Sequence, residues 1–496
     1  MVKKQLTGSE RDFLRRVSRS IFANPFSDER VRADVELTGA DPSLPYEKRL
    51  EKVIQAVSAR IKKVIADNKG DVRDFTGKDR ELLENAFMFN IYHRYYDSFD
   101  TLILEHIKTA DTSCSVSFAS EAIRLITDRG FSQDEAYHYF SVLFQMRRAF
   151  HFIDRSILGR SPCMKEFRLN LWNNVFTRDI GLYARYLWNR MEDYSTLLLG
   201  ETGAGKGLAA TAIGRSGYIP FNGKKGCFKE SFTQAFVSLN LSQFPEQLIE
   251  SELFGHRKGA FTGAVADHDG VFSRCSPHGA IFLDEIGDVS VPLQIKLLQV
   301  LQERLFTPVG SHEALRFSGR VIAATNKAIH KLRAEKIFRD DFYYRLCSDI
   351  ITVPPLRQRI REDPEELDFL LKHTLERIIG GPSEDLAIKV RDIVKAQVPA
   401  DYEWPGNVRE LEQCIRRILL KHSYIVDDHS LASIDIAENL AVKMREGSIN
   451  MQGLLSGYCK ILHDKYGTYE AIAKRTGLDR RTAKKYLEMW SRSEGQ

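Results

Sequence analysis

A short apolar run that leads into a glycine-rich loop constrains the fold of this chain most. The run STLLLG at residues 195–200 continues as ETGAGKG, which fits the pattern GxxxxGK, and the following LAATAIG suits a helix. Glycines there let backbone N–H groups wrap phosphate oxygens, and the helix N-terminus adds partial positive charge. A plain glycine-rich turn would need neither the strand nor the helix. The pattern predicts a phosphate-binding loop, with Lys206 reaching the β and γ phosphates. Its residues are Gly200, Glu201, Thr202, Gly203, Ala204, Gly205, Lys206 and Gly207.

An acidic pair at the end of a second apolar run completes the predicted phosphate site. Gly207 replaces the usual Ser or Thr whose hydroxyl binds Mg²⁺, so the metal would depend on phosphate oxygens, water and another carboxylate. In GAIFLDE (residues 279–285), Asp284 ends an apolar strand and can hold the hydrated Mg²⁺, while Glu285 can polarise an attacking water. A solvated strand end is the alternative, and the apolar run feeding directly into the acidic pair disfavours it.

Five apolar runs, each bounded by turn residues, indicate a parallel sheet. Helical patterns separate these runs, and alternation of strands and helices is typical of an α/β fold with helices covering the sheet. The five runs are residues 195–200, 235–240, 280–285, 320–326 and 349–355.

The first 155 residues indicate a mostly helical domain. In residues 46–67 apolar side chains recur at helical spacing. Aromatic residues are dense in residues 87–99, where a hydrophobic core is favoured over a ligand pocket. No motif in this region identifies a sensory class, so its signal stays open.

Composition excludes several classes of protein. The 496 residues include 72 Lys+Arg and 67 Asp+Glu, and the formal charge of +5 excludes a uniformly basic nucleic-acid coat protein. The seven cysteines form no CxxC pair, which disfavours a zinc ribbon or disulfide framework and favours a reducing compartment. The sequence shows no signal-peptide core and no run near the ~18 apolar residues that span a membrane. We therefore expect a cytoplasmic protein without a membrane partner.

A local basic patch lies near the end of the chain. Residues 466–490 place Ala473 four residues before Gly477, the spacing of a helix-turn-helix. The second helix would expose side chains suited to phosphate contacts and major-groove readout of DNA. A solvated basic helix is the alternative. The predicted DNA-binding residues are Arg480, Arg481, Thr482, Lys484 and Lys485.

The segment ESELFGHRKGAFTGA, residues 250–264, lies between the phosphate loop and the acidic pair. By composition alone it would be a glycine-rich turn that exposes one Phe. With it, residues 157–418 resemble the AAA+ ATPase domain of bacterial enhancer-binding proteins, the activators of sigma-54 RNA polymerase. The resemblance implies that the hexapeptide GAFTGA contacts sigma-54. These residues are Gly259, Ala260, Phe261, Thr262, Gly263 and Ala264.

Other positions match the same family. Asn240 matches the residue that restrains the catalytic glutamate until ATP binds, and Asn326 matches sensor I, which detects the γ-phosphate. Arg339 and Arg345 match two arginine fingers, and Arg409 matches sensor II of the lid. A guanidinium from a neighbouring subunit would stabilise charge on the transferring phosphoryl group. A surface salt bridge is the alternative for either finger.

The resemblance implies a sigma-54-dependent transcriptional activator. Such a protein binds enhancer DNA, forms a ring, here expected as a hexamer, and uses ATP with Mg²⁺ to remodel the closed complex of the sigma-54 RNA polymerase holoenzyme. The alternatives are a DNA-binding repressor with a regulatory or vestigial AAA+ domain and a AAA+ remodeller of another class. The intact hexapeptide counts against the second of these, and the acidic pair and arginines against the first.

The predicted organisation is multidomain, and two stretches, residues 164–200 and 214–236, are longer than the family norm and have no assigned role. The expected parts are a mostly α N-terminal regulatory domain at 1–155, an α/β P-loop AAA+ ATPase core at 156–365, a helical lid at 366–424, a linker at 425–450 and an all-α helix-turn-helix domain at 451–496.

Overall fold

The structure, a computed structural model, describes residues 3–67, 70–109, 114–426, 436–445 and 447–493. It separates into two compact units, and each is described by itself. The first comprises Met1–Asp392 with Asp401–Leu420, and the second comprises Ile393–Ala400 with Lys421–Gln496. Among the residues described, no helix combines the length and apolar composition needed to span a bilayer.

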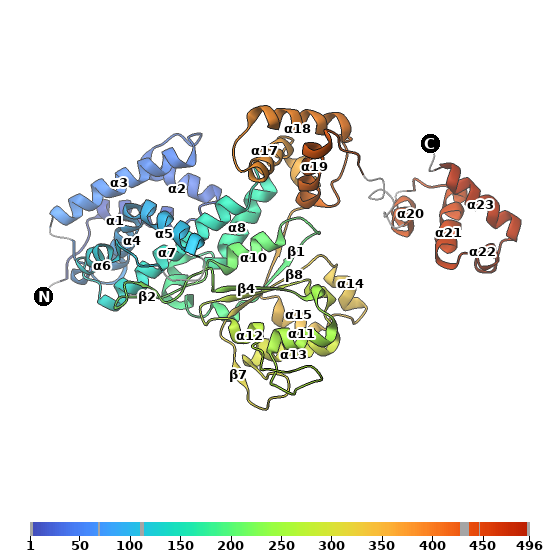
Figure 1. Cartoon of the computed structure of the whole chain (residues 1–496). Helices are drawn as coiled ribbons and strands as arrows, with labels where there is room; N and C mark the ends of the chain where they lie inside the picture. The colour runs from blue at the N-terminus through green and yellow to red at the C-terminus, as the bar shows by residue number, and fades with distance from the viewer. Residues whose placement is uncertain (1–2, 68–69, 110–113, 427–435, 446, 494–496) are drawn as a thin grey trace. The chain divides into compact units, whose positions relative to one another are not determined.

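A five-stranded parallel sheet lies at the centre of the first unit (Figure 1). All five runs predicted from the sequence are strands of this sheet, which confirms the α/β prediction. Parallel strands are buried on both faces, and this is why they read as continuous apolar runs. In sheet order they are β4 (Phe236–Asn240), β5 (Ala280–Asp284), β8 (Arg320–Thr325), β1 (Thr196–Leu199) and β9 (Asp349–Thr352).

The sheet divides the interior of the first unit into two hydrophobic cores. On β5, Ile281 and Leu283 pack into the core beneath α11 to α15, whereas Phe282 points into the core on the opposite face. The helices and the small hairpin of this α/β region are α10 (Lys206–Gly214), α11 (Glu246–Phe254), α12 (Val271–Arg274), α13 (Val291–Glu303), β6 (Leu305–Phe306), β7 (Leu315–Arg316), α14 (Ile329–Ala334), α15 (Asp340–Leu346) and α16 (Leu356–Glu362). Three more helices follow: α17 (Glu366–Ile379), α18 (Glu384–Gln397) and α19 (Asn407–Lys421).

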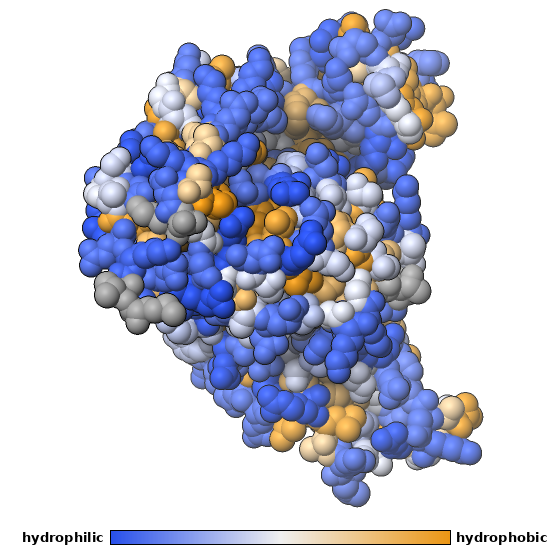
Figure 2. Space-filling view, turned by 90° about the vertical axis from the view of Figure 1, so that its left-hand side faces the viewer, coloured by the Kyte–Doolittle hydropathy of each residue, from blue (hydrophilic) through white to orange (hydrophobic). Residues whose placement is uncertain are grey.

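Seven helices form the N-terminal region, as the sequence predicts. Their surface in Figure 2 is mostly hydrophilic, and apolar residues show mainly in recesses. They are α1 (Gly8–Phe22), α2 (Asp28–Thr38), α3 (Tyr46–Ala66), α4 (Gly77–Arg94), α5 (Tyr96–Thr109), α6 (Ala119–Thr127) and α7 (Gln133–Ser156).

These helices share one continuous core with the face of the sheet that α10 covers. That core runs from Leu6 to Val353, so it crosses the predicted boundary near residue 155. Figure 1 shows α8 and α10 between the N-terminal helices and the sheet. The elements between α7 and the sheet also include α8 (Pro162–Phe176), α9 (Ile180–Leu182), η2 (Tyr183–Leu187) and the hairpin of β2 (Phe221–Asn222) and β3 (Cys227–Phe228).

The two stretches without an assigned role, residues 164–200 and 214–236, form the seam where the N-terminal helices meet the α/β core. On α7, Gln145 Nε2 donates to the Tyr183 hydroxyl at 2.7 Å and to the Ser216 carbonyl at 2.9 Å. Its neighbour Phe144 stacks on Phe228 of β3 with ring centroids 4.3 Å apart. The longer stretches thus join the N-terminal helices to the α/β core.

The second unit ends in a helical bundle with a small core of its own. Ile472 and Ala483 are fully buried there, with Leu478 and Tyr486 packed against them, as the helix-turn-helix pattern predicts. The helices are α20 (Ile436–Arg445), α21 (Met451–Tyr466), α22 (Tyr469–Thr476) and α23 (Arg480–Ser493).

The interval 425–450, predicted as a linker, contains helix α20. Its Leu440 is buried against Gly457 of α21, and a side chain at that glycine would collide with Leu440. Residues 427–435 lie outside the described residues.

Candidate nucleotide site and partner-contact surfaces

The phosphate loop lines a cavity of about 520 Å³ within the first unit. This volume lies in the ~300–1,000 Å³ range of small-molecule pockets. Parallel strands present their carboxyl ends at one edge of the sheet, so the loop after β1 meets the residues that end β4 and β5. Of the predicted site residues, those lining the cavity are Thr202, Gly203, Ala204, Gly205, Lys206, Gly207, Asn240, Asp284, Glu285 and Arg409.

Lys206 is held inside the loop. Its Nζ donates to the carbonyl of Gly200 at 2.9 Å and to that of Glu201 at 3.2 Å. Burial lowers the pKa of Lys206, and the carboxylates of Glu285 and Asp284 oppose that shift. The ammonium is therefore held beside the acidic pair by two loop carbonyls, and its third N–H is left for a phosphate ligand.

Gly203 is required by close packing of the loop against the segment that opens α19. Its φ is +77°, and a Cβ there would come within 2.2 Å of the Gly406 carbonyl oxygen. This approach brings Arg409 of α19 to the cavity.

The acidic pair has strained and partly unsatisfied geometry. Glu285 has a φ of 58°, a left-handed conformation that non-glycine residues rarely adopt and that clusters at active sites. Its N–H donates to Asp284 Oδ1 at 3.0 Å, and its Oε2 is buried without a partner among the described residues. An unpaired buried carboxylate oxygen facing a cavity fits a role in orienting water.

Asp284 is the residue that fits Mg²⁺ binding. In the described part of the chain, no group of three or more His, Cys, Asp or Glu side chains gathers as a metal site. A single carboxylate beside a phosphate cradle suits Mg²⁺, which keeps several waters and is completed by phosphate oxygens. With Gly207 in the loop, these oxygens would replace the missing hydroxyl.

The two asparagines occupy different surroundings. Asn326 Nδ2 donates to Thr202 Oγ1 at 2.9 Å, which ties the end of β8 to the phosphate loop. Asn240 lines the cavity, but its Oδ1 accepts from the N–H of Ser242 at 3.0 Å and from its hydroxyl at 2.7 Å. In this state Asn240 caps the turn η4 (Leu241–Gln243) rather than restraining Glu285.

Neither predicted arginine finger is among the residues that line this cavity. Arg339 pairs with Asp341 at 2.6 Å on the surface, at the start of α15. Arg345 donates from Nε to the Leu301 carbonyl at 2.9 Å. The chain thus holds the phosphate loop and acidic pair in one place and these two arginines in another.

The structure adds site residues that the sequence analysis missed. Glu201 of the loop forms two bonds with Arg357, at 2.7 and 2.5 Å, and also accepts from Asn407 at 3.1 Å. Its side chain therefore braces the loop against α16 and α19. His373 and Arg377 of α17 line the cavity as well. Glu201 is separated from both Arg357 and Asn407 by more than 150 residues in the sequence. No local sequence pattern therefore indicates these contacts.

The hexapeptide forms an exposed loop between α11 and α12. Gly259 and Gly263 have φ of +83° and +104°, and the Gly259 N–H donates to the Ala264 carbonyl at 2.8 Å. Phe261 is 39% exposed and contacts His256 edge-on at 4.9 Å. A large aromatic side chain left half in solvent on a glycine-hinged loop suits contact with another molecule.

The predicted DNA-binding residues lie at the start of α23 in the second unit. Arg481, Lys484 and Lys485 are exposed, and Arg480 pairs with Glu470 at 2.7 Å, also at the surface. Thr482 differs from the others, because its N–H and its hydroxyl both donate to Asp479, the residue that caps the helix. Four of the five side chains are thus presented to solvent, and the fifth is half-buried.

Comparison with known proteins gives the α/β core a family. Residues 184–352 match the family model described as the Sigma-54 interaction domain. Residues 184–352 therefore resemble a sigma-54 interaction domain. The fold class of the chain is an α/β domain with helical regions on either side. The domain model covers β1, the phosphate loop, the hexapeptide loop, the acidic pair and both arginines.

The chain is also similar to curated transcriptional regulators. The chain is 33% identical over 322 residues to "DNA-binding transcriptional regulator NtrC" of Azospirillum brasilense, covering 65% of this chain and 60% of that one. It is 41% identical over 230 residues to "Nif-specific regulatory protein" of Azotobacter vinelandii, covering 46% and 40%. It is 36% identical over 292 residues to "Transcriptional regulatory protein GlrR" of Escherichia coli (strain K12), covering 58% and 61%. The chain thus spans about half the length of the curated relatives it matches.

Among solved structures, NtrX from Brucella abortus in complex with ATP aligns with a TM-score of 0.40 and 22% identity, covering 75% of this chain and 80% of that one.

We expect the basic residues of α23 to be separable from the sigma-54 interaction domain. Replacing Arg480 and Arg481 together with Ala should weaken DNA binding and lower the salt slope of log K by about two if each contacts one phosphate. The surface pair of Arg480 with Glu470 contributes little stability, so the fold should survive. Fluorescence anisotropy with duplex DNA at several salt concentrations measures the slope. Lys460→Ala on α21, which removes a similar surface pair with Asp464, is the matched control. An unchanged slope in the double variant would place DNA contact elsewhere.

Proposed function

We propose that this chain is a ring-forming ATPase that activates transcription at sigma-54 promoters. The observation that carries the proposal is that the residues expected to hydrolyse ATP lie in two separate places on the chain. The chain's own cavity holds the phosphate loop and acidic pair, while Arg339 and Arg345 are not among the residues that line it. An active site completed by a neighbouring subunit explains both facts, and ring assembly, as a hexamer in the resembling family, supplies that neighbour.

The residues of the cavity divide the chemistry of hydrolysis among them. The loop N–H groups and Lys206 would bind the ATP phosphates, with Mg²⁺ held by Asp284 supplying charge neutralisation there. Glu285, with its unpaired Oε2, would orient and deprotonate the attacking water. Arg345 and Arg339 of the adjacent subunit would stabilise charge on the γ-phosphoryl group. The presence of a γ-phosphate would be transmitted to the sheet by Asn326, which bonds Thr202 of the loop. It would be transmitted to α19 by Arg409.

The chain path from the cavity to the hexapeptide supports coupling between the two. Asn240 caps η4, η4 leads into α11, and α11 ends at Gly255. Gly255 has a φ of +80° and approaches the His268 carbonyl so closely that a Cβ would lie 2.4 Å from it. The base of the loop is therefore rigid. A change at Asn240 when ATP binds would move α11 and its attached loop as one piece.

Promoter opening tests the whole proposal. Purified protein, sigma-54 holoenzyme, promoter DNA with upstream sites and ATP should give open complexes detectable by permanganate reactivity, with none in the presence of ADP. DNA binding without ATP-dependent opening would favour a repressor. ATP hydrolysis without any response of sigma-54 would favour a remodeller of another class.

The hexapeptide variant Thr262→Ala separates coupling from hydrolysis. Thr262 is exposed and lies outside the set of residues that line the nucleotide cavity. We therefore expect ATP turnover within about twofold of wild type and normal DNA binding, because no group that binds phosphate or DNA is removed. Promoter opening and retention of sigma-54 with a transition-state analogue of ATP hydrolysis should be lost. Val265→Ala, at an 81% exposed position just outside the hexapeptide, should behave as wild type. Full promoter opening by Thr262→Ala would contradict the activator proposal.

A further inference from the structure

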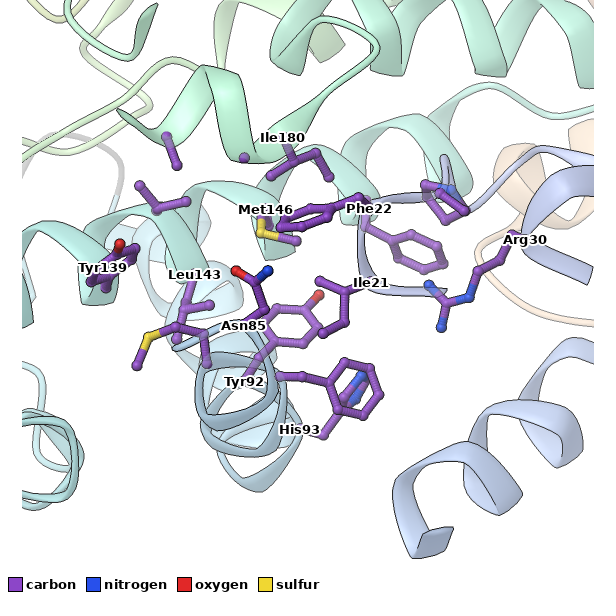
Figure 3. A pocket seen from close by; sticks show the side chains of 18 of the residues that line it. Ile21, Phe22, Arg30, Asn85, Tyr92, His93, Tyr139, Leu143, Met146 and Ile180 are labelled. Carbon is purple, nitrogen blue, oxygen red and sulfur yellow. The ribbon is translucent and has the colours of Figure 1, made fainter. Parts of the chain in front are cut away.

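A second cavity lies among the N-terminal helices, away from the nucleotide site. Its volume is about 100 Å³, and Figure 3 shows its side chains converging from the end of α1, from α4, α7 and α9. An engineered apolar cavity of ~150 Å³ binds benzene, so this cavity is somewhat smaller and would hold one ring only if its wall moves outward. The apolar part of the wall includes Ile21, Phe22, Met88, Leu143, Met146 and Ile180. Two methionines give this wall adaptable side chains that can accommodate an occupant.

Polar groups with unused hydrogen-bonding capacity face the same space. Arg30 is only 7% exposed, and its Nε donates to Asp34 at 2.8 Å, while its Nη2 is buried without a partner among the described residues. His93 Nδ1 is also buried and unpartnered in that set. Burial and the nearby charge of Arg30 lower the pKa of His93 to about 3, so its ring is neutral. A buried donor left unpaired, such as the Arg30 N–H, is costly, and an occupant with an acceptor would satisfy it.

The charge around the cavity selects a neutral occupant. Arg30 is already neutralised by Asp34, which is fully buried and also accepts from the Ser20 hydroxyl at 2.6 Å. Adding a net charge to this pair would leave it uncompensated in a poorly solvated site. A carbonyl or ether oxygen would accept from the free guanidinium N–H without that cost.

A larger groove provides the route of entry. A cavity of about 810 Å³ on the neighbouring side of α7 shares Pro25, Tyr46, His93 and Phe150 with the small one. A ligand would therefore enter past the Tyr46 and His93 rings.

We propose that this cavity binds a small neutral molecule with an apolar body, of about the size of one ring, and a single hydrogen-bond-accepting oxygen that Arg30 recognises. The aromatic segment 87–99 then has two roles. Phe87 belongs to the hydrophobic core, as the sequence analysis favours, while Phe89, Tyr92 and His93 line the cavity.

The position of the cavity connects its occupant to the nucleotide site. Helix α7 lines the cavity with Leu143 and Met146, and two residues later Arg148 donates to the carbonyls of Arg215 at 2.8 Å and Gly217 at 2.6 Å. These carbonyls directly follow α10, the helix that begins at Lys206. A shift of α7 upon binding would reach the phosphate loop through a rigid helix. This consequence, unlike the binding itself, rests on the proposed ATPase function.

Calorimetric titration of the full chain with three probes tests the binding. Acetophenone supplies a ring and a neutral acceptor, toluene lacks the acceptor, and benzoate carries a net charge. We expect acetophenone to bind with a submillimolar Kd, and toluene and benzoate at least about tenfold more weakly, the size of one lost hydrogen bond or one uncompensated charge. No binding of acetophenone, or tighter binding of benzoate, would overturn the proposal.

Two variants locate the site. Arg30→Lys keeps a cation beside Asp34 but removes the planar guanidinium whose second nitrogen is left for the ligand, so it should weaken acetophenone about tenfold and leave toluene within twofold. Met146→Trp should fill the cavity and abolish binding of both. Leu104→Trp, at a 44% exposed position on α5, is its matched control. Thermal unfolding shows whether each variant folds. If folded Met146→Trp still binds acetophenone with wild-type affinity, the ligand does not occupy this cavity.

The regulatory link has a separate readout. Saturating acetophenone should change ATP turnover by at least about twofold in wild type and have no effect in Met146→Trp. Binding without that change would refute the link through α7 and leave the binding site standing. A chain that binds acetophenone but never hydrolyses ATP would refute the proposed function alone.

Discussion

The variant Arg345→Ala is expected to lose on the order of 10³-fold in ATP turnover, the usual cost of removing an arginine finger. Binding of ATP should change little, because Arg345 does not line the chain's own nucleotide cavity. Steady-state turnover and fluorescent-nucleotide titration measure the two quantities. Arg333→Ala, which removes a surface pair with Asp340, is the matched control and should retain turnover.

A structural role for Arg345 is the competing explanation, since its Nε donates to the Leu301 carbonyl. Loss of one such hydrogen bond costs about 1 kcal/mol, which cannot account for a 10³-fold effect in a folded protein. Mixing distinguishes the two. Rings assembled from Arg345→Ala and Glu285→Gln subunits contain some interfaces with both groups intact. Recovery of turnover on mixing two inactive variants shows action in trans, and absence of any recovery would place the role of Arg345 within its own subunit.

The sheet and the phosphate loop were predictable because their signals are local. Strands of a parallel sheet are buried on both faces, so β5 reads as an unbroken apolar run that ends at Asp284. The loop needs glycine at positions such as Gly203, whose φ of +77° and close approach to Gly406 exclude a side chain. In such cases the physical requirement falls on consecutive residues, and the sequence displays it directly.

The seam between the N-terminal helices and the α/β core was not predictable. Gln145 and Arg148 bond backbone carbonyls of residues 215–217, some 70 positions along the chain, and a carbonyl has no sequence signature. The same holds for the brace from Arg357 to Glu201. The role of the two longer stretches therefore becomes clear only when the surface that they cover is known.

The state of the site was also invisible in the sequence. Family resemblance assigns Asn240 a contact with Glu285, yet here it caps η4 through Ser242. The two arrangements differ only in local hydrogen bonds, and no residue type records which of them the chain adopts. With Asn240 bonded to Ser242, the catalytic competence of Glu285 depends on its own geometry and on what enters the cavity.

Replacing Glu285 with Gln tests that geometry directly. The isosteric amide keeps the size of the side chain but removes the charge of an oxygen, Oε2, that is buried and unpartnered among the described residues. We expect turnover to fall by about 10²–10⁴-fold, the contribution of a general base. Affinity for ATP should be retained or rise, because one negative charge beside the phosphates is gone. Glu412→Gln, which removes another carboxylate that lines the same cavity, is the matched control and should keep turnover within a few-fold. Equal losses in both variants would mean that the electrostatics of the whole cavity, rather than a base at Glu285, govern hydrolysis.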